Sequence, residues 1–66
     1  MENLGKVLEV STKDGQVYTG VLSNIDVYLC CLGLSNAKNL RSRVKFDYLI
    51  FRATDITNLH LSLIHI

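Results

Sequence analysis

Residues that could carry out catalysis or bind metal are few in this chain of 66 residues. Cys30 and Cys31 are adjacent, and neighbouring side chains on a strand point to opposite faces, so this pair is not expected to form an ordinary disulfide or to hold a metal ion. His60 and His65 also fall on opposite faces of a strand. The serines, threonines and carboxylates form no Ser-His-Asp order, carboxylate pair or phosphate-binding glycine loop. The sequence predicts no enzyme, cofactor or metal site.

Basic side chains offer binding chemistry instead. Lys38, Arg41, Arg43 and Lys45 fall within one segment, residues 38–45, that contains no acidic residue. Such a segment can contact phosphates or an acidic peptide, or it can be a solvated loop between strands. The net charge of the whole chain is only +1, so the sequence predicts a local basic cluster and not the global basic excess of a duplex-binding protein.

The aromatic residues divide into core and surface candidates. Phe46 and Phe51 are expected to pack in the core. Tyr28 and Tyr48 can bury a ring while the hydroxyl stays in water, and an exposed pair could stack bases or seat a leucine-rich helix. Two alternatives stay open for Arg52, which either forms an ion pair with Asp26 across the sheet or faces a ligand.

Length and composition favour one small globular domain. Hydrophobic residues make up 48% of the chain, charged residues 20%, and proline is absent. A chain this short buries only about 60% of the surface that its unfolded form exposes, so its core is thin. No apolar run approaches the roughly 18 residues that a membrane-spanning helix needs, and no membrane contact is expected.

Turn signals divide the chain into short runs rich in branched and aromatic residues. These predicted strands cover residues 6–12, 16–26, 28–34, 44–52 and 56–66. Lys13-Asp14-Gly15 predicts a hairpin turn, Gly20 predicts a bend inside the second strand, and the polar segment 35–43 predicts a loop. The sequence thus predicts an all-β domain, a five-stranded antiparallel meander that closes into a small, strongly bent barrel.

The order of these segments resembles the Sm/LSm family from residue 4 to about residue 60. Asp14 to Leu22 with its central Gly20, followed by Ile25-Asp26, resembles the first Sm motif. Phe51-Arg52-Ala53, followed by Asp55-Ile56, resembles the second. The resemblance implies an Sm-like barrel that binds a partner and has no catalytic machinery.

The same resemblance marks a candidate RNA pocket. In RNA-binding Sm subunits, an asparagine four residues after the aspartate, the arginine and a following glycine grip a flipped-out uridine. Here the matching positions are Asp26, Cys30, Arg52 and Ala53, so a thiol replaces the amide and alanine replaces the glycine. One of two possible functions, the alternative to the adaptor described next, is a ring subunit that binds uridine-rich RNA. Its rings would be closed by the edges of the fourth and fifth strands.

The segment FRATDITNL, residues 51–59, is most similar to a divergent branch of the family: the N-terminal LSm domain of the enhancer-of-mRNA-decapping proteins, with the Trailer-hitch type next. This likeness implies a monomeric cytoplasmic adaptor of processing bodies (P-bodies). It would bind short helical leucine-rich motifs of the decapping enzyme or its activator and promote mRNA decay, with RNA bound weakly if at all. The residues expected to bind the partner are Tyr28, Arg41, Arg43, Lys45, Tyr48 and Arg52.

The last six residues, LSLIHI, resemble an in-frame translation of a transposon-library sequencing adaptor. We therefore expect residues 1–60 to form the LSm domain and residues 61–66 to be an artefact that extends the last strand. The alternative is a genuine final strand, because the alternation of apolar residues is acceptable for one.

Overall fold

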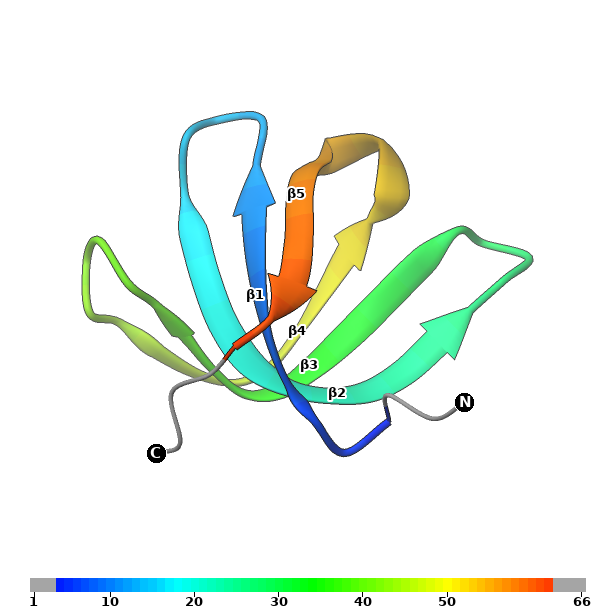
Figure 1. Ribbon diagram of the computed structural model, residues 1–66, viewed down its shortest axis with the longest axis horizontal. Helices are drawn as coiled ribbons and strands as arrows, with labels where there is room; N and C mark the ends of the chain where they lie inside the picture. The colour runs from blue at the N-terminus through cyan, green and yellow to red at the C-terminus, as the bar shows by residue number, and fades with distance from the viewer. Residues whose placement is uncertain (1–3, 63–66) are drawn as a thin grey trace.

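The computed structural model describes residues 4–62, which form one strongly bent, five-stranded antiparallel sheet (Figure 1). Its elements are β1 (Val7–Thr12), β2 (Val17–Asp26), β3 (Cys31–Asn39), β4 (Lys45–Arg52), the short 3-10 turn η1 (Ala53–Asp55) and β5 (Ile56–Leu61). The all-β prediction is confirmed. No helix among residues 4–62 is long and apolar enough to cross a membrane.

The strand order is β4-β3-β2-β1-β5. The predicted meander therefore holds for the first four strands and is wrong for the fifth, because β5 pairs with β1 and not with β4. The long strands β2 and β3 curve through the whole domain, and this curvature brings β5 back beside β1 (Figure 1). As a result, β4 and β5 are the two edges of the sheet within the described part of the chain.

The bend in β2 depends on Gly20, as the sequence predicted. A Cβ atom at Gly20 would lie 3.0 Å from Cβ of Leu34, and 3.1 Å from both Cα of Ala37 and the carbonyl oxygen of Ser35. The pairing of β2 with β3 shifts register between Thr19 and Val21. A hydrogen atom is thus the only side chain that lets β3 cross this closely.

The predicted loop over residues 35–43 is wrong for its first half, since β3 continues to Asn39. Leu34 and Ala37 are both buried although they stand three residues apart. Asn36 lies between them at a positive φ of 49°, a left-handed conformation that asparagine adopts more readily than most residues. This kink turns Ala37 into the core opposite Phe46, so a polar segment serves as a strand.

The core is small and lies inside the curve of the sheet. Its buried apolar residues are Leu8, Val10, Leu22, Leu34, Ala37 and Phe51. The ring of Tyr18 packs against Phe51 at a centroid distance of 5.1 Å and against Phe46 at 6.4 Å. Core positions for both phenylalanines are confirmed.

We expect Gly20→Ala to lower the free energy of unfolding by about 1–3 kcal/mol, because an added methyl group overpacks a site walled by backbone. Gly33→Ala is the matched control. The atoms nearest to its new methyl belong to the end of the Tyr48 ring, which is half-exposed and can turn into water. Urea unfolding of both variants tests this, and a loss for Gly33→Ala as large as that for Gly20→Ala would contradict it.

Candidate functional site

The structure brings the two Sm-like motifs together at one end of the sheet. β2 ends at Asp26 and β3 begins at Cys31, which pairs with Arg52 at the end of β4. The backbone N–H of Ala53 donates a 2.8 Å hydrogen bond to the carbonyl oxygen of Cys30. Asp26, Cys30, Arg52 and Ala53, the four positions of the candidate RNA pocket, therefore lie in two adjoining connections. We call residues 26–31 with Arg52 and Ala53 the motif end.

The turn between β2 and β3 is ordered by its own aspartate. The carboxylate of Asp26 accepts a 3.0 Å hydrogen bond from the backbone N–H of Leu29. Cys30 closes the turn at a positive φ of 53°, and its thiol lies 3.5 Å from the carbonyl oxygen of Val27. The prediction that the third strand begins at residue 28 is wrong, and Cys30 and Cys31 do not share a strand.

The ion pair between Asp26 and Arg52, one of the two alternatives for Arg52, does not form. The Asp26 carboxylate instead accepts the hydrogen bond from Leu29, three residues further along the chain. Such a local hydrogen bond needs little ordering of the chain. Among residues 4–62 the only ion pair joins His60 to Glu9 at 3.3 Å. Arg52 is exposed and has no acidic partner in that range, which leaves its guanidinium available to a ligand.

Apolar side chains at the tip of this turn are unusually exposed. Tyr28 is 97% exposed, Val27 75% and Leu29 72%. These three consecutive exposed apolar side chains make the tip of the turn a candidate binding surface, because burying apolar surface gains about 25 cal/mol per Å². The exposed ring of Tyr28 is free to stack on a planar group or to pack against apolar side chains.

A shallow hollow of about 330 Å³ opens beside the turn. Its walls are almost entirely apolar, and Asp26 is the only charged residue among them. The lining residues are Ile25, Asp26, Val27, Cys30, Cys31, Leu32, Ala53 and Ile56. Sequence reasoning missed Val27, Leu29 and this hollow, because the run from residue 28 to residue 34 has strand composition and the turn at Asp26 carries no glycine.

The other predicted partner-binding residues lie elsewhere. Arg41, Arg43 and Lys45 belong to the connection of β3 to β4 and to the start of β4, at the far end of β3 from Tyr28 (Figure 1). Tyr48 lies on β4, where its ring covers Gly33. The predicted set thus falls into two groups, with Tyr28 and Arg52 at the motif end and Arg41, Arg43 and Lys45 at the far end of β3, while Tyr48 lies between them on β4.

Neither group has the features of a catalytic or metal site. No group of three or more His, Cys, Asp or Glu side chains within residues 4–62 could hold a metal ion. The hydroxyl of Thr12 donates to the carboxylate of Asp14 and lowers the pKa of that carboxyl group. This pair belongs to the predicted hairpin turn between β1 and β2, so the shift has a structural cause.

We expect Cys30→Asn to raise the free energy of unfolding by about 0.5–1 kcal/mol, because asparagine tolerates the left-handed backbone better than cysteine does. Cys31→Asn is the matched control. Cys31 is the first residue of β3 and is half-buried, so asparagine there should destabilise. Thermal unfolding of both variants checks the prediction, and a loss of stability in Cys30→Asn would contradict it.

Comparison with known proteins finds solved structures that share this fold. No protein-family profile and no curated protein matches the chain. Among solved structures, it is similar to a novel Sm-like archaeal protein from Pyrobaculum aerophilum, with 29% identity, a TM-score of 0.84 and 98% of this chain covered. The chain spans about half of that protein, 49% of its length.

Two further structures share the fold at lower identity. A heptameric archaeal Sm protein has 19% identity and a TM-score of 0.80, covering 92% of this chain and 91% of its own. A Sm protein of Pyrococcus abyssii, solved in complex with a uridine heptamer, has 19% identity and a TM-score of 0.78, covering 92% of this chain and 89% of its own. The chain has the Sm-like fold, and these structures support the resemblance to the Sm/LSm family.

Proposed function

We propose that this Sm-like chain is a non-catalytic Sm/LSm subunit that binds single-stranded, uridine-rich RNA at the motif end. The observation that carries this is that the same end of the sheet holds an almost fully exposed aromatic ring, Tyr28, and an arginine with no acidic partner among residues 4–62, Arg52. The backbone hydrogen bond from Ala53 to Cys30 fixes the two connections that carry them. Two of the similar structures are a heptamer and a uridine complex, which supports the same reading.

The chemistry suits an unpaired base. An exposed aromatic ring stacks on any base and contributes about 1–3 kcal/mol. A guanidinium stacks on the other face of a base or pairs with a phosphate. The thiol of Cys30 is only a weak hydrogen-bond donor and a weak acceptor, whereas an asparagine amide is a good donor and a good acceptor. We therefore propose weaker selection for uridine over the other bases than a pocket with an asparagine would give.

Substitutions at the motif end test RNA binding. Tyr28→Ala should weaken an oligouridylate complex by about 1–3 kcal/mol without lowering stability, since the side chain is exposed. Arg52→Gln should also make the dependence of log K on log salt shallower by about 0.7, the value for one phosphate of a single strand. Lys13→Gln, at the β1–β2 turn, is the charge control. Fluorescence anisotropy at several salt concentrations measures both, and unchanged affinity in Tyr28→Ala and Arg52→Gln would refute the proposal.

Cys30→Asn gives an independent check. By resemblance, asparagine at this position helps to hold the uridine, so the variant should bind oligouridylate more tightly than the parent and discriminate more strongly against oligoadenylate. A Cys30→Ser variant, which replaces the side-chain sulfur by oxygen without adding an amide, should gain neither affinity for oligouridylate nor discrimination against oligoadenylate.

The two edges of the sheet suit assembly into a ring. β4 exposes Ile50 by 65% and Tyr48 by 45%, and β5 exposes Leu59 and Leu61 by 44% each. An open edge with apolar side chains is a template for another strand. We propose that β4 of one copy pairs with β5 of the next. This contact is heterologous and closes into a ring when the rotation between copies permits it.

Lysines on the edge strand test the assembly. Tyr48→Lys/Ile50→Lys should convert the assembly to monomers, because edge lysines block strand addition. Leu40→Lys/Val44→Lys is the matched control, since both residues are exposed apolar residues of the β3–β4 connection and not of an edge strand. Light scattering gives the mass of each. If the parent protein is a monomer, the proposed ring assembly is wrong.

A second candidate function rests on the apolar hollow at the motif end. Its lining and the exposed Val27 and Leu29 suit leucine side chains of an amphipathic helix. This is the adaptor reading that the resemblance to decapping activators implies: a cytoplasmic, P-body domain that is monomeric and binds decapping factors.

A leucine-rich helical peptide separates the two candidates. In the adaptor reading it binds with a Kd near the micromolar range, about −8 kcal/mol, and Leu29→Asp abolishes binding. Calorimetry measures this, with a scrambled peptide as the control. If oligouridylate binds and the peptide does not, the adaptor reading falls.

A further inference from the structure

The apolar interior of the domain is left open along β5. Leu59 is the cross-strand partner of Val10, which is fully buried. Leu61 is the partner of Leu8, which is 5% exposed. Cross-strand partners share one face of a sheet, so both β5 leucines lie on the core side. Each is nevertheless 44% exposed, because within residues 4–62 no strand pairs with the outer edge of β5.

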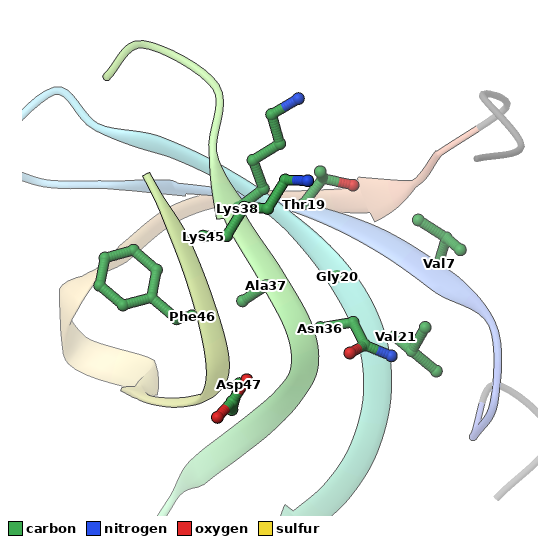
Figure 2. A pocket seen from close by; sticks show the side chains of 10 residues that line it. All are labelled: Val7, Thr19, Gly20, Val21, Asn36, Ala37, Lys38, Lys45, Phe46 and Asp47. Carbon is green, nitrogen blue, oxygen red and sulfur yellow. The ribbon is translucent and has the colours of Figure 1, made fainter. Parts of the chain in front are cut away.

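The opposite face of the sheet carries a polar row that crosses all five strands. The register places five residues side by side, one from each strand: Lys45, Lys38, Thr19, Glu9 and His60. Figure 2 shows the first three of these close together on one side of the sheet. Asn58 stands two residues before His60 on β5, so it shares this face. Its side chain is exposed and makes no hydrogen bond within residues 4–62.

The other edge strand, β4, shows the same division between its two faces. Leu49 and Phe51 belong to the core or pack against it. Tyr48, Ile50 and Arg52 alternate with them and are exposed. A β4 edge that pairs with the β5 edge of a second copy must match core side with core side, because a slip of one residue turns every side chain to the wrong face.

Among the antiparallel registers that match the faces, one pairs both β5 leucines with apolar residues of β4. It places Leu59 of one copy opposite Phe51 of the next. Leu61 then lies opposite Leu49. A slip of two residues in one direction moves Leu61 onto the charged Asp47, and the opposite slip moves Leu59 beyond the last residue of β4. The apolar residues thus select a single register.

This register sets Asn58 of one copy directly opposite Arg52 of the other, both on the face away from the core. Directly opposed side chains have Cβ atoms about 4.5–5.5 Å apart. Arg52 is exposed at the motif end and has no acidic partner within residues 4–62. The amide of Asn58 is a good donor and a good acceptor, which the thiol of Cys30 is not.

We propose that each motif end is completed as an RNA site by Asn58 of the neighbouring copy. Phe51 pairs with Leu59 across the subunit boundary, Arg52 contacts the phosphate or stacks on the base, and the neighbour's Asn58 amide bonds to an edge of that base. The inference rests on the proposed RNA-binding ring and names the residue that a second copy adds to the site. A single copy therefore holds an incomplete site.

Disulfide cross-linking tests the register. The selected register sets Ile50 opposite His60, and opposed strand residues have Cα atoms about 4.5–5.5 Å apart, a span that a disulfide bridges. In a Cys30→Ser/Cys31→Ser background, Ile50→Cys/His60→Cys should give a ladder of covalent oligomers on a non-reducing gel after mild oxidation. Tyr48→Cys/His60→Cys sets its cysteines two residues out of register and is the matched control. The register is overturned if the first pair stays unlinked in an assembly that light scattering detects, or if the control links as readily.

Subunit mixing tests the composite site. Asn58→Ala alone should weaken oligouridylate binding about 2- to 10-fold, the loss of about one hydrogen bond. Thr57→Ala, at the adjacent exposed position, should bind like the parent chain. When Asn58→Ala and Arg52→Gln chains are unfolded in urea and refolded together, some sites combine the intact Arg52 of one variant with the intact Asn58 of the other. Fluorescence anisotropy should then detect sites of parental affinity, which neither variant gives when it is refolded alone.

The outcomes separate this inference from the proposed function. If the mixture shows no recovery although each variant alone is weakened, the two residues do not meet across a subunit boundary, and the composite site is overturned while RNA binding stands. Parent-like affinity of Asn58→Ala overturns it in the same way. If the parent chain assembles and cross-links in the selected register but does not bind oligouridylate, the proposed function fails and the composite site falls with it.

Discussion

The close crossing of β2 and β3 at Gly20 is the constraint on which the rest of the structure depends. Backbone and Cβ atoms of β3 lie where a side chain at Gly20 would be, so the two longest strands bend together. Asn36 absorbs the bend on β3 with its left-handed backbone and returns Ala37 to the core. A flat sheet of this size would leave one apolar face in water, whereas the bent sheet covers that face with its own strands.

The same bend decides where the functional groups lie. It returns β5 to β1, which leaves β4 and β5 as open edges, and it places the two ends of β3 at opposite sides of the domain. The Sm-like motifs meet at one of these ends because Cys31 begins β3 and pairs with Arg52 at the end of β4. The connection of β3 to β4, which carries Arg41 and Arg43, occupies the other end for the same topological reason.

The sequence predicted well wherever local chemistry decides the structure. Asp14-Gly15 specifies a hairpin turn, Gly20 a bend, and the aromatic residues at 46 and 51 a core. It failed where a contact distant in sequence overrides local composition. Residues 35–39 are polar enough to predict a loop, yet β2 and β4 supply hydrogen-bond partners on both sides. Of the two alternatives for Arg52, the ion pair failed in the opposite way, since the local N–H of Leu29 satisfies the Asp26 carboxylate.

Cys30, where the resembling Sm motif has an asparagine, bears most directly on the choice between RNA and a leucine-rich helix as the ligand. An amide in the left-handed position of the turn would add both a donor and an acceptor to the site, and the thiol present removes most of that polarity from a hollow that is otherwise apolar. In the proposed RNA site, hydrogen bonding to base edges would be weakened as a result, while stacking on Tyr28 and charge attraction to Arg52 would be untouched. These two remaining forces act on any single strand, so affinity for RNA can persist after much of the selectivity for uridine is lost. The apolar hollow that the substitution leaves is also what a leucine side chain requires, and for this reason one residue makes both proposed ligands chemically reasonable at the same end of the sheet.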